Sequence, residues 1–144
     1  MIERAVSVTP ELLDALRRLI PQLTGRSPGP DVNELGLILG SGSSALLVAR
    51  YPDAHGPIVG AGALGVYRVP TGVRAVIEDV VVDEGSRGLG LGEALMRGLL
   101  NLAKKLGARG VSLTSNSSRL AANRLYLRMG FGLRHTNCYY FDFR

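Results

Sequence analysis

The stretch that decides the fold covers residues 80–92 and reads Val80-Val81-Val82-Asp83-Glu84-Gly85-Ser86-Arg87-Gly88-Leu89-Gly90-Leu91-Gly92. Its first three residues are β-branched and apolar, which predicts a buried strand. A polar turn containing glycine follows, and the last glycines open a long helical pattern. Free N–H groups at a helix start, together with the helix dipole, favour an anion. The order of strand, glycine turn and helix therefore predicts a loop that holds phosphate.

The glycine spacing separates this loop from two other phosphate-binding loops. No Gly-Lys-Ser/Thr follows the glycines, so the loop is not a Walker A loop. A dinucleotide-binding G-x-G-x-x-G that starts at Gly88 would need its third glycine at Glu93. The loop instead resembles the Arg/Gln-x-x-Gly-x-Gly/Ala signature of the GNAT acetyltransferase superfamily, with Arg87, Gly90 and Gly92 at the three fixed positions. The alternative is a glycine-rich turn that only joins a strand to a helix.

That resemblance implies a cosubstrate, acetyl-CoA, whose pyrophosphate the loop grips. It also implies that the strand Val80–Val82 holds the pantetheine arm through its backbone, and that its N–H groups polarise the acetyl carbonyl, provided that the strand splays from its parallel neighbour. The cofactor-binding residues implied in this part of the chain are Val80, Val81, Val82, Arg87, Gly88, Leu89, Gly90, Leu91 and Gly92.

Length and composition predict one compact domain over residues 1–144. Hydrophobic residues make up 46% and charged residues 20% of the chain, which is typical of a water-soluble protein. No apolar run is long enough to cross a membrane, and no signal peptide is recognisable. The single Cys138 excludes an intrachain disulfide, and one cysteine with two histidines argues against a metal site. We expect a cytoplasmic protein without a metal and without a membrane partner.

The net charge of +5 suits either nucleic acid or a polyanionic cofactor such as CoA. The basic residues are scattered and form no long Lys/Arg run, and the glycine loop is not needed for nucleic-acid binding. We therefore expect no nucleic-acid partner.

Hydrophobic periodicity predicts an α/β chain of the α+β type. Helices are predicted over residues 10–20, 31–38, 90–106 and 119–129, and strands over residues 2–8, 44–51, 58–67, 74–82, 110–114, 132–136 and 138–143. Short turns join the three strands between residues 44 and 82, so these strands are expected to be antiparallel. The strand after the long helix is expected to lie parallel to the strand before it. The prediction is a GNAT-like fold: a central, mixed, mostly antiparallel sheet of about six to seven strands with helices on both faces.

A second motif lies in residues 116–131. Positions 119, 123 and 126 share one helical face, which places Arg119, Asn123 and Tyr126 in one column. The segment resembles the superfamily pattern Ala-x-x-x-Tyr-x-x-x-Gly-Phe, with Ala122, Tyr126, Gly130 and Phe131 in place. The resemblance implies that Tyr126 donates a proton to the leaving thiolate. The alternative for Tyr126 is a buried aromatic residue bonded to the backbone.

Arg119 departs from the family pattern, because many members have asparagine at this position and bond the CoA arm with it. Arg119 then contacts a phosphate, or the amide role passes to Asn123 or to Asn116. The alternatives are that Asn123 is a solvated helix residue and that Asn116 is a turn residue.

Glu78 and Asp79 precede the valine run, and two adjacent carboxylates are unusual in an apolar strand because burying a charge is costly. Alternation places them on opposite faces of the sheet unless a bulge intervenes. One of them would face the acceptor as general base or as an anchor for the amine. The run over residues 77–82 resembles glucosamine-6-phosphate N-acetyltransferases, whose acidic pair meets the sugar. The alternative is a carboxylate paired with Arg74 or another cation.

Taken together, the motifs predict an N-acetyltransferase that moves the acetyl group from acetyl-CoA to a small-molecule or protein amine. No Ser, Cys or His arrangement suggests a covalent intermediate, so direct attack within a ternary complex is the simpler mechanism. The catalytic candidates are Tyr126, Glu78 and Asp79. The alternative is a catalytically silent CoA-binding sensor or interaction module. The sequence does not determine the oligomeric state, and a homodimer is one of the states that it allows.

Overall fold

The computed structural model describes all residues, Met1–Arg144, and they form two compact units. The N-terminal unit, Met1–Leu113, contains all the strands and the first three α-helices. The C-terminal unit, Thr114–Arg144, contains the fourth α-helix.

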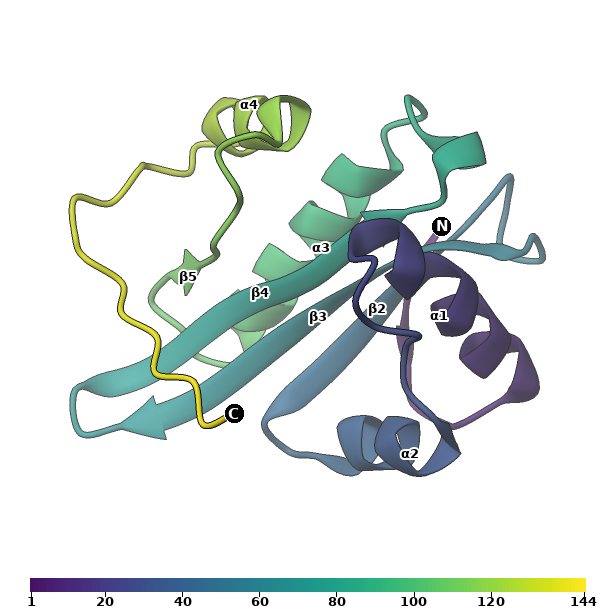
Figure 1. The fold of residues 1–144 in the computed structure, drawn as a ribbon, viewed down its shortest axis with the longest axis horizontal. Coiled ribbons are helices and arrows are strands. Elements are labelled where there is room, and N and C mark those ends of the chain that lie inside the picture. Colours follow the sequence, from purple (N-terminus) through teal and green to yellow (C-terminus); the bar gives the residue numbers. More distant parts are fainter. The chain divides into compact units, whose positions relative to one another are not determined.

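The N-terminal unit is built on a five-stranded sheet in the order β1-β2-β3-β4-β5 (Figure 1). The strands are β1 (Ile2–Ala5), β2 (Ser44–Arg50), β3 (Ile58–Val69), β4 (Gly72–Val82) and β5 (Val111–Ser112). The first four strands pair antiparallel in sequence order, and β5 pairs parallel to β4. The predicted antiparallel meander and the parallel pair around the long helix are thus confirmed.

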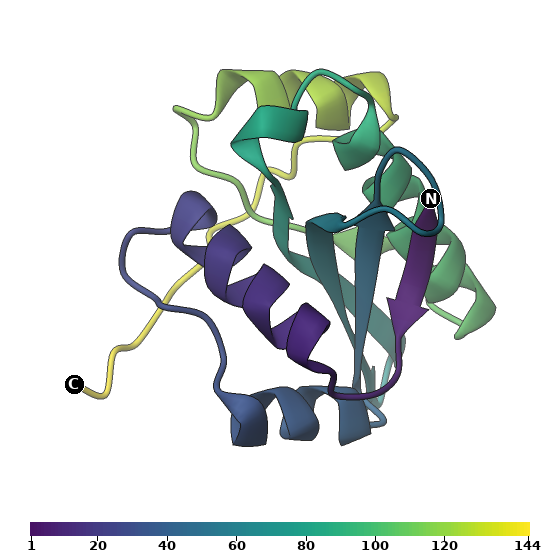
Figure 2. The ribbon, with the colours of Figure 1, turned by 90° about the vertical axis from the view of Figure 1, so that its right-hand side faces the viewer.

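Helices cover both faces of this sheet. Helices α1 (Pro10–Leu23) and α2 (Val32–Gly40) lie on one face, and α3 (Leu91–Lys105) lies on the other (Figures 1 and 2). The hydroxyl of Thr9 caps α1 by accepting from the N–H of Leu12 at 3.1 Å, and Asp31 and Glu34 form a capping box at the start of α2. These caps fix where the two helices start over the sheet. The prediction of a mixed sheet with helices on both faces is confirmed.

The core under α1 and α2 is made of leucines from the helices and of alternate residues from the strands. Its strand residues include Leu46, Val48, Ala61 and Val81. Leu19, Leu35 and Leu95 are fully buried, and Leu95 belongs to α3 on the opposite face. Burial of this kind contributes roughly 1.5–3 kcal/mol for each large apolar side chain.

Helix α3 packs closely on the sheet, and this explains the glycine inside it. A Cβ atom at Gly98 would lie 3.0 Å from Cδ1 of Leu47 and 3.2 Å from Cγ2 of Ile2. The same holds on the strand side, where a Cβ at Gly62 would lie 3.0 Å from Cδ1 of Leu99. The helix propensity lost at Gly98 therefore allows a closer approach of helix and sheet.

The structure corrects the number of strands and some of their ends. The sheet has five strands rather than six or seven, because residues 132–136 and 138–143 form no strand. Their aromatic residues favour extended structure, but a strand needs a partner that completes the hydrogen-bond ladder, and none pairs with them. Strand β1 ends at Ala5 rather than at residue 8, and β5 has only two residues.

No helix of the structure has the length and the apolar character that are needed to cross a membrane.

The close approach of α3 predicts how Gly98 tolerates substitution. Gly98→Leu is expected to lower the free energy of unfolding by about 1–3 kcal/mol, because the added side chain has to displace Leu47 and Ile2. Gly98→Ala is the matched control, since its single methyl group meets only the ends of two flexible side chains, and the gain in helix propensity of about 1 kcal/mol opposes the crowding. Urea unfolding of both variants measures the difference. A leucine variant as stable as the alanine variant would contradict the packing described here.

Candidate functional site

The loop between β4 and α3 has the open backbone that the sequence predicts. After a short 3-10 turn, Glu84–Ser86, Gly88 and Gly90 both adopt left-handed conformations, with φ of 80° and 78°. Gly90 is the N-cap of α3. A Cβ atom at either glycine would meet no atom within 4 Å, so the space beside the loop backbone is open. Both the conformation and the space suit a ligand that approaches the N–H groups at the start of α3.

The other predicted loop residues divide into exposed and buried ones. Arg87 and Leu89 are exposed, and Leu91 is buried with its side chain in the core. The Nε of Arg87 donates to the carbonyl oxygen of Val82 at 3.2 Å, which places this cation beside the end of β4. Leu91 can therefore serve a ligand only through its backbone.

Strand β4 leaves its parallel neighbour early. The ladder between β4 and β5 consists of the pairs Ala75 with Val111 and Val76 with Ser112. On the β5 side, residues 77–82 of β4 thus have no ladder partner in the N-terminal unit. The stretch Val80–Val82 agrees in this respect with the splayed strand expected from the sequence.

A β-bulge lies between the acidic pair and the valine run. On β3 only Gly62 stands between Ala61, which pairs with Val81, and Ala63, which pairs with Glu78, whereas β4 has two residues at this point. One of them, Asp79, has a φ of 53°, which is left-handed. The bulge that the sequence left open is therefore present at Asp79.

The bulge decides which face each side chain takes. Glu78 stands opposite Ala63, which packs against the core under α1 and α2, so Glu78 lies on that face of the sheet. Both Glu78 and Asp79 are exposed, which removes the cost of burying two charges. Neither carboxylate pairs with Arg74, whose guanidinium donates to the hydroxyl of Thr71 at 2.8 Å. The alternative of a carboxylate paired with Arg74 is thus wrong.

The remaining candidates lie in the C-terminal unit, around α4 (Leu120–Arg128). The side-chain amide of Asn123 donates to the carbonyl oxygen of Asn116 at 3.0 Å. The Oδ1 of Asn116 accepts from the N–H of Ser118 at 2.9 Å and from its hydroxyl at 2.7 Å. Both asparagines therefore stabilise the turn that leads into α4, as the turn alternative for Asn116 predicts.

Arg119 and Tyr126 differ from the asparagines. Arg119 is the N-cap residue of α4, and its side chain is exposed. Tyr126 is half-buried, and its ring meets that of Phe131 edge to face at 5.9 Å between centroids. Its hydroxyl makes no hydrogen bond within the protein, so the alternative of a buried tyrosine bonded to the backbone is wrong.

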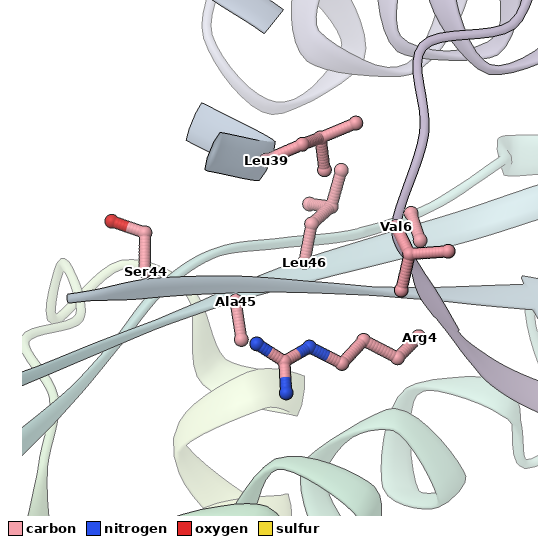
Figure 3. A pocket seen from close by; sticks show the side chains of 7 residues that line it. Arg4, Val6, Leu39, Ser44, Ala45 and Leu46 are labelled. Atoms are coloured by element: carbon pink, nitrogen blue, oxygen red, sulfur yellow. The ribbon is translucent and has the colours of Figure 1, made fainter. Parts of the chain in front are cut away.

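One pocket of the N-terminal unit has no part in this arrangement. It has a volume of about 120 Å³ and lies at the β1–β2 edge of the sheet, away from β4 in the strand order, beside Arg4, Leu39 and Leu46 (Figure 3). Sites for small molecules usually measure about 300–1,000 Å³. The protein also has no cluster of three or more His, Cys, Asp or Glu side chains that could hold a metal ion.

The comparison with known families settles the family. The family model described as Acetyltransferase (GNAT) family matches residues 12–131. The chain belongs to the GNAT family. The match includes both the glycine loop and the segment around Tyr126, the two motifs that carry the resemblance in the sequence.

This GNAT chain is similar to two proteins of trypanosomes. It is 40% identical over 79 residues to a glucosamine 6-phosphate N-acetyltransferase of Trypanosoma brucei brucei, and the match covers 53% of this chain and 52% of that protein. The chain thus spans about half the length of that curated relative. It is also similar to the crystal structure of an acetyltransferase of Trypanosoma brucei, with 28% identity, 99% of each chain covered and a TM-score of 0.74.

A further solved structure is similar in fold. An aminoglycoside acetyltransferase from an uncultured soil metagenomic sample matches with a TM-score of 0.85, with 100% of this chain and 96% of that chain covered, at 19% identity. At this identity the likeness concerns the fold alone.

Sequence reasoning missed one feature of this GNAT domain, a network between α1 and the start of the glycine loop. Arg18 and Gln22 of α1 both bond the carboxylate of Asp83, the residue that follows β4. Burial disfavours the charged form of Asp83, but the hydrogen bonds from Gln22 and Arg18 outweigh burial and lower the pKa of this carboxyl. Only the spacing of Arg18 and Gln22 by one helical turn is visible in the sequence, and it does not indicate a partner more than 60 positions away.

Proposed function

We propose that this chain transfers the acetyl group of acetyl-CoA to an amine. The observation that carries the proposal is the glycine loop, whose left-handed Gly88 and Gly90 leave open space at the start of α3. Membership of the GNAT family supports acetyl transfer, and the relative named as a glucosamine 6-phosphate N-acetyltransferase supports an amine as acceptor.

In this proposal, the cosubstrate is held by β4 and by the loop after it. The N–H groups of residues 88–92 bind the pyrophosphate, and Arg87 adds a positive charge beside it. The open edge of Val80–Val82 holds the pantetheine arm through backbone hydrogen bonds. It also supplies N–H groups that polarise the acetyl carbonyl. Bound acetyl-CoA supplies an activated acyl group, and the protein supplies position and charge.

The acceptor side is assigned to the face of β4 that carries Glu78. Glu78 is exposed there and has no partner, so its carboxylate is free to hold an ammonium group or to take its proton. Asp79, in the bulge, is the second candidate. Tyr126 is proposed as the acid that protonates the leaving thiolate, and its unbonded hydroxyl supports this role. Transfer is proposed to occur directly within a ternary complex.

We propose further that the two units act as one acetyltransferase domain. The family match runs over residues 12–131 and crosses the boundary between the units at Leu113, which supports this reading. The acceptor is a small-molecule or protein amine, and an amino sugar such as glucosamine 6-phosphate is the first compound to test, because a relative carries that name.

The loop assignment predicts the effect of a charge at Gly90. Gly90→Asp is expected to weaken acetyl-CoA binding more than about tenfold, or about 1.4 kcal/mol, because it places a negative charge where phosphate is proposed to bind. Gly90→Asn is the matched control, since asparagine has the same shape without the charge and tolerates the left-handed conformation. Calorimetric titration of both variants separates charge from backbone strain. An affinity of the folded aspartate variant equal to that of the unaltered protein would remove the loop from the binding site.

Glu78 is expected to act on the acceptor and not on the cosubstrate. Glu78→Gln should lower the rate of thiol release by at least about tenfold and leave the affinity for acetyl-CoA unchanged, because the amide keeps the shape but neither takes a proton nor pairs with an ammonium group. Asp79→Asn, measured in parallel, tests the second candidate. Full activity of the Glu78 variant across about pH 6 to 9 would refute its role.

Tyr126 is expected to contribute to turnover through its hydroxyl. Tyr126→Phe keeps the ring and its contact with Phe131, so the fold should persist while the proton donor is lost. General acid catalysis is typically worth about 10²–10⁴ in rate, and a loss of at least about tenfold is expected even if water partly replaces the phenol. Steady-state thiol release and a binding titration of the same variant test this together.

Two results would change these assignments. Wild-type turnover in the Tyr126 variant would remove this residue from the mechanism, and a large loss of affinity would make it a binding residue. Tight binding of acetyl-CoA by the unaltered protein without thiol release for any amine would instead favour a catalytically silent CoA-binding module.

A further inference from the structure

We propose that Arg18, Gln22 and Asp83, together called the α1 clamp, set the shape of the glycine loop and thereby the affinity for the pyrophosphate of the cosubstrate. These three are positioning residues, because none of them is assigned a contact with substrate. The inference rests on the proposed function, since it concerns the loop that is proposed to bind acetyl-CoA.

The clamp holds the carboxylate of Asp83 from two sides. The Nε of Arg18 donates to Oδ2 of Asp83 at 3.1 Å, and the Nε2 of Gln22 donates to Oδ1 at 3.3 Å. Arg18 and Gln22 are one helical turn apart, so a rigid helix presents both donors on the same face. Each oxygen of the carboxylate is therefore held by a different residue of α1.

Gln22 also holds the backbone of the next residue. Its Oε1 accepts from the N–H of Glu84 at 2.9 Å, where the 3-10 turn begins. One side-chain amide thus binds the side chain of Asp83 and the main chain of Glu84. This pair of bonds fixes the direction in which the chain leaves β4.

Strand β3 also holds Arg18 and Asp83, through two of its carbonyl oxygens. The Nη2 of Arg18 donates to the carbonyl oxygen of Ile58 at 2.6 Å, and the N–H of Asp83 donates to the carbonyl oxygen of Val59 at 2.8 Å. The carbonyl oxygen of Asp83 accepts from the N–H of Ser86 at 2.8 Å, which closes the turn. The first residue of the loop is therefore tied to α1, to β3 and to its own turn.

The middle of the loop has no comparable support. Gly88, Leu89 and Gly90 are exposed, and they lie between Arg87, whose side chain bonds the carbonyl oxygen of Val82, and the buried Leu91 at the start of α3. The loop is thus held at its start by the clamp and at its end by α3. Binding of a pyrophosphate by several N–H groups depends on their alignment, so loosening one anchor is expected to weaken binding even though no contact with the ligand is removed.

The ion pair of the clamp is expected to contribute little to folding, which makes its role testable. The side chains of Arg18 and Asp83 are 47% and 23% exposed, and ion pairs near the surface add little to stability. Loss of the clamp should therefore change cosubstrate binding more than it changes the unfolding temperature.

The test measures four variants of α1 with two acetyl donors. Gln22→Met removes the three hydrogen bonds of the amide, those to Asp83 and Glu84 among them, at similar size, and Arg18→Gln removes the charge at the ion pair. Arg17→Gln is the matched control, because Arg17 is the neighbouring exposed arginine of α1 and makes no contact with Asp83. Arg18→Lys, which keeps a cationic donor, is the conservative rescue. Each variant is measured with acetyl-CoA and with acetyl-pantetheine, which lacks the pyrophosphate, and its unfolding temperature is recorded.

In the expected result, Gln22→Met and Arg18→Gln raise the KM for acetyl-CoA about fivefold or more, with kcat at saturation nearly unchanged. Their kcat/KM with acetyl-pantetheine stays close to that of the unaltered protein. Arg17→Gln behaves like the unaltered protein, and Arg18→Lys recovers part of the affinity.

Three results would overturn the proposal. An unchanged KM for acetyl-CoA in both clamp variants would do so, and so would an equal loss with both donors, which would indicate a general structural role. If Gln22→Met does not fold, the Arg18 pair and its Arg17 control decide alone. If the unaltered protein neither binds acetyl-CoA nor releases thiol from it, the proposed function fails and the clamp proposal fails with it. Normal activity of the unaltered protein with insensitive clamp variants overturns the clamp alone.

Discussion

The two-residue period of a β-strand is the constraint on which the rest of this structure depends. Strand β4 has to place Val81 in the core under α1 and α2, and it has to place Val80 beside Gly62 toward α3. Without an extra residue, Glu78 and Val80 would share a face, and Val81 would point to the other side. The bulge at Asp79 inserts that residue, and its left-handed φ of 53° is the backbone conformation that accommodates it. Glu78 and Val81 can therefore lie on the same face, the first in solvent and the second in the core. A single backbone irregularity thus separates the acidic pair from the valine run and gives the two ends of β4 different environments.

The far end of β4 faces a second constraint, because its chain has to turn into α3 while keeping its N–H groups accessible. Two left-handed glycines allow the turn, and the absence of a β5 partner after Val76 leaves the strand edge open. Such an open segment loses conformational entropy when it is ordered, and few contacts of its own offset that loss. The bonds from Arg18 and Gln22 to Asp83 order the start of the segment, and the burial of Leu91 orders its end. The loop can then remain open in its middle without being free at both ends.

The features predicted well from sequence are those encoded by local patterns. The leucines at residues 91, 95, 99 and 102 identify α3, the glycine spacing identifies the loop, and the pattern around Tyr126 identifies α4. Features that depend on a residue far away in the sequence were harder to predict. Residues 132–143 have the composition of strands, but their state depends on a pairing partner that composition does not specify. The bonds of Asp83 join positions 61 and 65 residues apart, and the bulge at Asp79 depends on the register with β3. For the same reason the sequence left Glu78 and Asp79 without an assigned face, and it took structure to show that both are exposed.

In the C-terminal unit, the hydrogen bonds already formed around α4 limit which side chain can bind a ligand. Of the three residues considered for the amide role of the family asparagine, Asn116 and Asn123 already use side-chain groups to build the turn before α4. These bonds use the Oδ1 of Asn116 and the Nδ2 of Asn123, whereas the guanidinium of Arg119 is exposed and has all its donors uncommitted. A guanidinium has five N–H donors and no acceptor, whereas an asparagine amide both donates and accepts. Arg119 can therefore bind a carbonyl oxygen or a phosphate, but it cannot accept from an amide N–H of a pantetheine arm. We accordingly favour the interpretation that the exchange of asparagine for Arg119 moves this contact from an amide toward an anionic or carbonyl oxygen of the cosubstrate.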